Sequence, residues 1–222
     1  MTRLVVPAFL LVFTVAAWGA DVVIDDWKSQ KLGARGVPEG WLGGQNWGLP
    51  QYDMTIEENE GHRVLHLRSK IESSVIRKDI RGKVNLKETP ILVWSWKAVT
   101  LPKNGDCRKK SADDQAAQLY VVWPRFPEAV RSQIIGYIWD TTAPAGSIVK
   151  SEKTSTVTYV VMRSGPADLG KWITEWRNVV EDYKKIYGAE PDSPGYISIA
   201  IDSDDTTSFA ESVFGSILLR KP

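Results

Sequence analysis

The chain has 222 residues, of which 43% are hydrophobic and 25% are charged, values typical of a globular protein. This composition excludes a disordered chain, a collagen-like repeat and a coiled coil. Lys and Arg number 28 against 27 for Asp and Glu, so the chain offers no general electrostatic attraction to nucleic acid or anionic lipid. We therefore expect no nucleic-acid partner, and one domain spanning residues 21–222.

The N-terminal segment has the three-part layout of a secretory signal. Arg3 precedes an apolar run from Leu4 to Trp18, and small residues follow. The run is shorter than the roughly 20 residues that a membrane-spanning helix needs, which makes a permanent anchor the weaker alternative. We expect removal of residues 1–20, export to the periplasm or the cell exterior, and no stable membrane anchor.

Cys107 is the only cysteine, so the chain cannot form an internal disulfide. The basic residues that follow it, from Arg108 to Lys110, could lower the thiol pKa and make the thiol reactive. The alternative is an unreactive thiol in a loop.

Short segments rich in β-branched and aromatic residues recur along the chain, separated by polar residues or by Gly and Pro. They predict an all-β fold, a jelly-roll-like sandwich of two antiparallel sheets. In the third segment, Leu65 and Leu67 point to one side while Val64 and His66 point to the other. The predicted strands are residues 22–27, 52–57, 63–69, 74–80, 91–98, 118–123, 134–139, 156–162, 196–201 and 213–219.

Residues 171–187 fit two interpretations. Their apolar residues fall at helical spacing, which would give one long amphipathic helix. Trp172, Thr174 and Trp176 also alternate as one face of a strand, and Gly188 could end a short helix. We favour a strand followed by one short helix near residues 180–187.

Tryptophan is the most frequent aromatic residue once the signal is removed. Trp94 and Trp96 point to the same side of one strand, and Trp139 ends another. An indole ring suits a sandwich core and also suits the C–H face of a sugar. We name Trp94, Trp96 and Trp139 as candidate ligand-stacking residues, with core packing as the alternative.

Two acidic clusters are candidate polar sites. Asp113 and Asp114 precede one strand, and Asp202, Asp204 and Asp205 follow another. Calcium prefers several oxygen ligands, so we name Asp202, Asp204 and Asp205 as candidate calcium ligands. The alternative is that these aspartates cap turns and pair with basic residues. Asp113, Asp114 and Arg177 are the candidate polar contacts to a ligand.

The sequence carries no recognisable catalytic motif. With two histidines, it excludes a multi-histidine zinc site, and it lacks the nucleophile elbow and the glycine fingerprints of phosphate or dinucleotide binding. We expect no cofactor other than the calcium considered above, and the residues leave catalysis unsupported.

The order of short motifs resembles a known family. Asp25-Asp26-Trp27 is followed by Pro38-Glu39-Gly40-Trp41, by Leu92 to Lys97 and by Asp113 to Ala116, and Asp202 to Thr206 precede the last strand. This set is similar to an exported bacterial family catalogued as a domain of unknown function, number three-zero-four-seven, for which the resemblance implies no activity. The layout is also loosely similar to galactose-binding-like jelly rolls, many of which bind sugars.

These observations favour an exported, non-catalytic binding module whose ligand is a saccharide or a cell-envelope glycan. One alternative is an envelope enzyme that acts on glycans through a pair of carboxylates. Another is a structural or interaction protein of the periplasm. The residues do not indicate an oligomeric state.

Overall fold

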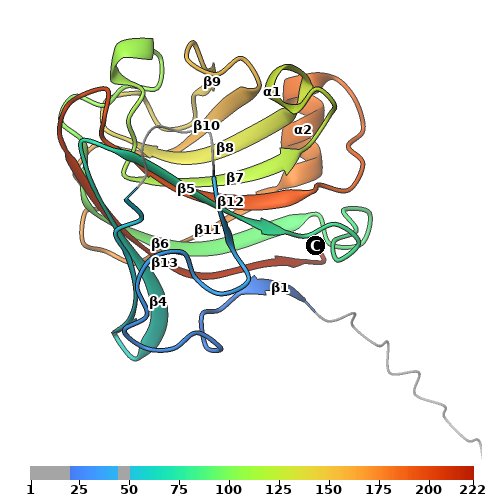
Figure 1. Ribbon diagram of the computed structural model, residues 1–222. Coiled ribbons are helices and arrows are strands. Elements are labelled where there is room, and N and C mark those ends of the chain that lie inside the picture. Colours follow the sequence, from blue (N-terminus) through green and yellow to red (C-terminus); the bar gives the residue numbers. More distant parts are fainter. Residues whose placement is uncertain (1–20, 45–50) are drawn as a thin grey trace, which may run out of the picture.

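The computed structural model describes residues 21–44 and 51–222, so the expected signal segment lies outside the described residues. The described chain forms two packed β-sheets with two α-helices, which confirms the predicted all-β sandwich. Figure 1 shows the sheets as separate layers, with β1 beside β13 at the bottom of the six-stranded sheet. No helix of the described residues is long and apolar enough to span a bilayer.

The six-stranded sheet has the order β11-β6-β13-β4-β3, with β1 paired to β13, and the seven-stranded sheet has the order β2-β5-β12-β7-β8-β10-β9. The strands of the first sheet are β1 (Val22–Asp25), β3 (Met54–Asn59), β4 (His62–Lys70), β6 (Ile91–Thr100), β11 (Ile173–Asn178) and β13 (Phe209–Arg220). Those of the second are β2 (Leu42–Gly43), β5 (Ser73–Asp79), β7 (Ala117–Trp123), β8 (Gln133–Asp140), β9 (Ile148–Lys150), β10 (Val157–Ser164) and β12 (Tyr196–Asp202).

All ten predicted strands are present, and β2 and β9 are two short strands that the residue pattern did not indicate. The sandwich is antiparallel except at one pair, since β10 runs parallel to β8. The chain turns back after β8 to form β9, which pairs antiparallel with β10 on its other side. This connection corrects the expectation of two purely antiparallel sheets.

Residues 171–187 form a strand followed by a helix, as we favoured. The strand β11 ends at Asn178, whose side chain accepts hydrogen bonds from the backbone N–H groups of Val180 and Glu181. This N-cap starts α2 (Val179–Tyr187), and Gly188 ends it with a positive φ of 71°. A second short helix, α1 (Glu128–Arg131), and a 3₁₀ turn at Lys110–Ala112 were not predicted.

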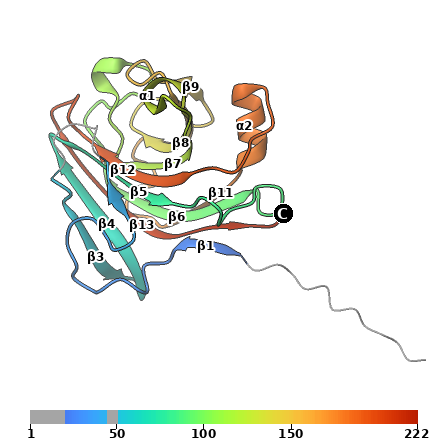
Figure 2. The ribbon, with the colours of Figure 1, turned by 45° about the vertical axis from the view of Figure 1, so that its right-hand side comes forward.

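Side chains of α2 hold it at one end of the sandwich, where Figure 2 shows it standing beside the sheets. The Tyr183 ring lies 4.7 Å from that of Trp123, measured between ring centres. The Tyr137 hydroxyl donates to Asp182 Oδ2 at 2.8 Å, and Arg177 from β11 binds both oxygens of the same carboxylate. Aromatic packing and a partly buried charge pair therefore fix the helix.

Aromatic rings fill the space between the two sheets. Trp94 and Trp96 from β6 are 0% exposed, and Trp139 from β8 is 1% exposed. The ring of Trp96 packs against Trp94, Trp139 and Phe214, at centre distances of 5.4, 6.1 and 6.0 Å. Rings without exposed surface offer no face to a ligand, so the prediction that Trp94, Trp96 and Trp139 stack on a ligand is wrong.

This packing predicts a large difference between two tryptophans on neighbouring strands. Trp96→Ala should lower the free energy of unfolding by about 3–5 kcal/mol, because it empties a fully buried site. Trp176 on β11 is 66% exposed, so Trp176→Ala is the matched control and should change stability by less than about 0.5 kcal/mol. Urea unfolding followed by circular dichroism measures both, and equal losses would contradict the assignment of Trp96 to the core.

Candidate functional site

A groove of about 460 Å³ lies on the outer face of the seven-stranded sheet. Along β12, Ile197, Ile199 and Ile201 point into the inter-sheet core, so Ser198 and Asp202 point outward. The floor of the groove comes from β5, β7, β10 and β12, and loops at the strand ends supply its rim. The groove is lined by Ser73, Arg77, Tyr120, Tyr159, Tyr196, Ser198 and Asp202 from the strands, and by Asp113, Glu128 and Asp204 from the segments around them.

One row of side chains crosses the groove on five neighbouring strands. Arg77 pairs with Ser198, Ser198 with Tyr120, Tyr120 with Gly136 and Gly136 with Tyr159. A Cβ atom at Gly136 would lie 2.6 Å from Cε1 of Tyr120 and 3.1 Å from Cδ1 of Tyr159. Glycine at this position therefore leaves the room in which the two tyrosine rings lie over the sheet.

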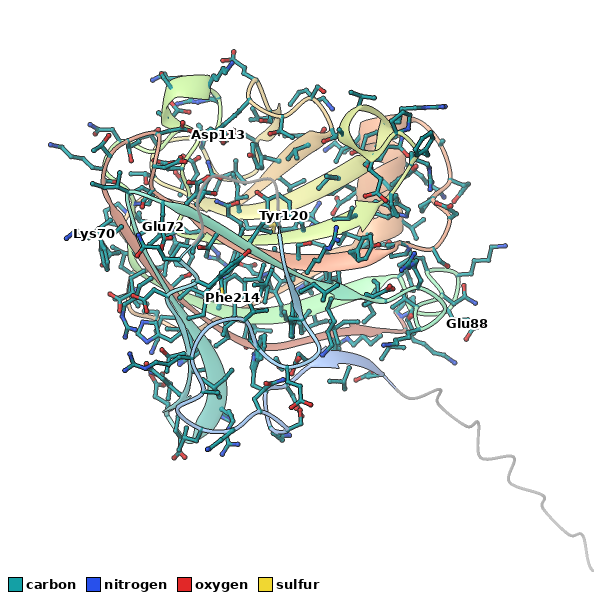
Figure 3. All side chains as sticks on the ribbon, viewed as in Figure 1. Lys70, Glu72, Glu88, Asp113, Tyr120 and Phe214 are labelled. Carbon is teal, nitrogen blue, oxygen red and sulfur yellow. The ribbon has the colours of Figure 1, made fainter. Side chains whose placement is uncertain are left out.

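Asp113 lies at the end of the groove, in the loop before β7 (Figure 3). Its carboxylate accepts hydrogen bonds from Gln115 Nε2 at 2.9 Å, Ser151 Oγ at 3.1 Å and the Tyr159 hydroxyl at 3.2 Å. Burial nevertheless raises the pKa of Asp113 to about 6, since a charged carboxylate loses much of its hydration there. The Tyr120 hydroxyl, labelled with Asp113 in Figure 3, donates to Gln118 Oε1.

Arg77 is the cation of the groove without an anionic partner. Its guanidinium lies 5.0 Å from the centre of the half-buried Tyr196 ring, the geometry of a cation–π contact. Within the described part of the chain it forms no hydrogen bond or ion pair, and its buried Nε has no partner. A buried donor without an acceptor is costly, and none of the described residues supplies an acceptor to Arg77 Nε.

A group of carboxylates lies at the same end of the groove as Asp113, because the end of β12 lies beside the start of β7. Asp114, Asp202 and Asp204 each offer one oxygen, and these three oxygens lie within 4.8 Å of one another, so the group could hold a metal ion. Burial, reinforced by the nearby charges of Asp114 and Asp204, raises the pKa of Asp202 to about 9. Asp202 therefore keeps its proton at neutral pH in this arrangement.

Asp205 is not part of this group. Its carboxylate pairs with Lys153, which also lies 3.5 Å from Asp204. Asp114 joins instead, and its oxygens also accept hydrogen bonds from the backbone N–H groups of Asp205 and Thr206. Of the three metal ligands expected from the sequence, Asp202 and Asp204 lie in this group, whereas Asp205 lies outside it and pairs with Lys153.

The remaining predicted ligand contacts do not converge. Asp113 lines the groove, whereas Asp114 lies behind it, fully buried, and holds the loop between β12 and β13. Arg177 belongs to the opposite sheet, where its guanidinium forms an ion pair with Asp182. The structure therefore gives Arg177 a structural contact and no place in the groove.

The surroundings of Cys107 make its thiol unreactive. It is 1% exposed, and burial together with the nearby Asp140 carboxylate raises its pKa well above the usual range. The basic residues after it do not lower this pKa, because Arg108 and Lys109 pair with Asp106.

Sequence reasoning missed the main groove residues, Arg77, Tyr120, Tyr159 and Tyr196. Each alternates with core residues along its strand, so alternation shows that they share the outer face of their sheet. The pattern does not show which strands are neighbours. Only the folded structure shows that Arg77 has no hydrogen-bond or ion-pair partner among the described residues, because its neighbours come from distant parts of the sequence.

The raised pKa of Asp202 predicts a pH dependence of stability. The unfolded carboxyl group loses its proton near its ordinary pKa of 3.8, whereas the folded one keeps it to about pH 9. Between these values the folded state binds more protons, so stability falls as pH rises, by up to about 1.4 kcal/mol per pH unit. Asp202→Asn removes this titration and should flatten the decline above about pH 6, where Asp113 no longer contributes.

Urea unfolding between about pH 6 and pH 9, in EDTA to exclude metal ions, measures this effect. Asp21→Asn, at an exposed carboxylate, is the control and should leave the pH dependence unchanged. A decline as steep in Asp202→Asn as in the wild type would refute the protonated state of Asp202.

No curated protein matches the sequence significantly. Among solved structures, the family 11 carbohydrate-binding module of the cellulosomal cellulase Lic26A-Cel5E of Clostridium thermocellum shares 7% identity and a TM-score of 0.47, with 91% of this chain and 95% of that one covered. The family 30 module of the Clostridium thermocellum cellulase Cel9D-Cel44B shares 11% identity and a TM-score of 0.46, with 91% and 98% covered. The xyloglucanase domain of NopAA from Sinorhizobium fredii shares 9% identity and a TM-score of 0.43, with 87% of this chain and 100% of that one covered.

These distant likenesses carry no information about the ligand or activity of this chain. The family model described as "Protein of unknown function (DUF3047)" matches residues 40–218, which include the groove and every strand except β1 and the end of β13. The chain belongs to this DUF3047 family.

Proposed function

We propose that this protein is an exported, non-catalytic module that binds a saccharide in the groove of the seven-stranded sheet. The single observation that carries the proposal is the guanidinium of Arg77, which lies beside the Tyr196 ring and has no hydrogen-bond or ion-pair partner among the residues that the structure describes. An arginine fork next to an aromatic ring can bind the oxygens of a sugar while the ring contacts its C–H groups. Export rests on the three-part pattern of residues 1–20.

The rest of the groove supports the same chemistry. Its volume falls in the range of small-molecule sites. Ser73 lines it from the same strand as Arg77, and Ser198 lines it from the next strand, opposite Arg77; neither hydroxyl bonds another side chain in the described residues. These groups are donors and acceptors at fixed positions on adjacent strands, where they can orient a ligand rich in hydroxyl groups.

Hydrolysis of the bound saccharide is a second candidate, because the groove contains two carboxyl groups with raised pKa values. Asp202 has a pKa of about 9 and keeps its proton at neutral pH, whereas Asp113 has a pKa of about 6 and is mostly ionised there. A general acid in glycoside hydrolysis needs a raised pKa of this kind. Both groups are already engaged in the chain's own contacts, which is why we place binding first.

Arg77→Gln should weaken saccharide binding at least tenfold, because it removes the positive charge and the fork of donors from the groove. Affinity electrophoresis against a panel of neutral and acidic polysaccharides, followed by titration calorimetry with the best one, measures the loss. Arg220→Gln is the matched control, since Arg220 is exposed on the other sheet and also unpaired within the described chain. We expect wild-type affinity for this control.

Equal affinities of Arg77→Gln and the wild type would remove the groove as the binding site. Release of new reducing ends from the bound polysaccharide, abolished by Asp113→Asn, would replace the binding function with hydrolysis.

We also propose that Asp114, Asp202 and Asp204 bind a calcium ion at the end of the groove. The proposal rests on the three oxygens that lie within 4.8 Å of one another. Main-chain oxygens of the β12–β13 loop and water would complete the six to eight ligands that calcium prefers.

Calcium at about 1 mM, a concentration suited to extracellular calcium modules, should raise Tm by several degrees relative to EDTA. Asp204→Asn should abolish the increase. Asp205→Asn, which removes one charge from the same loop outside the carboxylate group, should retain it. Identical melting curves in calcium and EDTA would exclude a stabilising ion.

A further inference from the structure

A second cavity, of about 640 Å³, lies on the outer face of the six-stranded sheet. Ser95 lines it from β6, between Trp94 and Trp96, which point the other way into the core. Thr174 from β11 and Ser216 from β13 complete its floor, and Trp172 forms part of its wall. This cavity belongs to the opposite sheet from the groove and shares no lining residue with it.

A β-bulge in β13 shapes the cavity. Phe214 pairs with Trp96 and Ile217 with Trp94, so Gly215 and Ser216 together oppose Ser95 alone. A Cβ atom at Gly215 would lie 2.2 Å from Ser95 Oγ and 3.4 Å from the Trp172 ring. The Gly215 carbonyl accepts a hydrogen bond from Trp27 Nε1 at 2.7 Å, which holds the bulge in place. We call this space the bulge cavity.

Trp172 is held in position by the chain itself. Its indole N–H donates to Asn59 Oδ1 at 3.0 Å, and Lys97 Nζ lies 5.0 Å from its ring centre. Lys97 in turn donates to the same Asn59 oxygen at 2.7 Å. The half-buried ring is therefore ordered before any ligand binds, and the cost of ordering it does not reduce the affinity.

The polar groups of the bulge cavity favour an uncharged ligand. The side-chain hydroxyls of Ser95, Thr174 and Ser216 have no hydrogen-bond partner in the described part of the chain. The charges around them balance: Asp26, Glu58 and Glu60 stand against Lys28, Arg63 and the adjacent Lys97. Free hydroxyls and a fixed indole ring without excess charge match a molecule that has many hydroxyl groups and an apolar face.

We propose that the bulge cavity is a second binding site, for a neutral saccharide that packs on Trp172 and exchanges hydrogen bonds with Ser95, Thr174 and Ser216. The protein then presents two sugar sites on opposite sheets. The groove contains a cation, Arg77, that has no partner among the described residues, whereas Lys28 and Arg63 of the bulge cavity are each bound by oxygens of the chain.

Titration calorimetry of the full chain with cellohexaose, xylohexaose and mannohexaose tests this site. At least one of these neutral oligosaccharides should bind, and Trp172→Ala should weaken its binding at least tenfold. Ser216→Trp should have the same effect by filling the cavity, and its exposed position makes it safe for folding. Ser111→Trp, at an exposed serine of the 3₁₀ turn, is the matched control and should bind normally.

Each variant is compared with the wild type and also in the Arg77→Gln background, so that loss of binding at the groove is not mistaken for loss at the bulge cavity. Neutral binding that survives Arg77→Gln and disappears in Trp172→Ala or Ser216→Trp supports the second site. The proposal is overturned if none of the three oligosaccharides binds. It is also overturned if folded Ser216→Trp binds as tightly as Ser111→Trp.

Discussion

The packing of aromatic rings between the two sheets is the interaction on which the rest of the structure depends. Trp94 and Trp96 leave β6 on the same side, so both rings enter the space between the sheets and contact Tyr137, Trp139 and Phe214. The indole N–H groups of Trp94 and Trp96 have no partner there, which costs about 1–3 kcal/mol each. The large apolar surface that these rings bury offsets that cost.

Because strand side chains alternate, this core determines what each outer face can carry. With Trp94 and Trp96 inside, Ser95 must face outward, and it lines the bulge cavity. On the other sheet, Leu119 and Val121 enter the core, so Tyr120 faces outward into the groove. The two candidate sites are therefore consequences of one packing arrangement, which presents polar or amphipathic side chains on both outer surfaces.

The sequence was sufficient for most of the fold and for little of the candidate site. Alternation placed Leu65 and Leu67 correctly on a core face, and the spacing around Asn178 and Gly188 predicted a strand followed by a helix. Composition could not separate a core tryptophan from a ligand-binding one, because both uses favour the same residue. The acidic clusters were located correctly as loops, but the pairing of Asp205 with Lys153 depends on a contact between distant segments.

Two kinds of feature distinguish the outer faces from ordinary protein surface, and both require the assembled sheets. The first is glycine that leaves space: Gly136 makes room for Tyr120 and Tyr159, and Gly215 for Ser95 and Trp172. The second is polar side chains that have no hydrogen-bond partner within residues 21–44 and 51–222, Arg77 beside the tyrosine row and Ser95 beside the bulge. Folding alone gains nothing from an unsatisfied donor or an unfilled cavity. Their coincidence on each sheet is what an external ligand with many oxygens would explain, since it fills the space and completes the hydrogen bonds together.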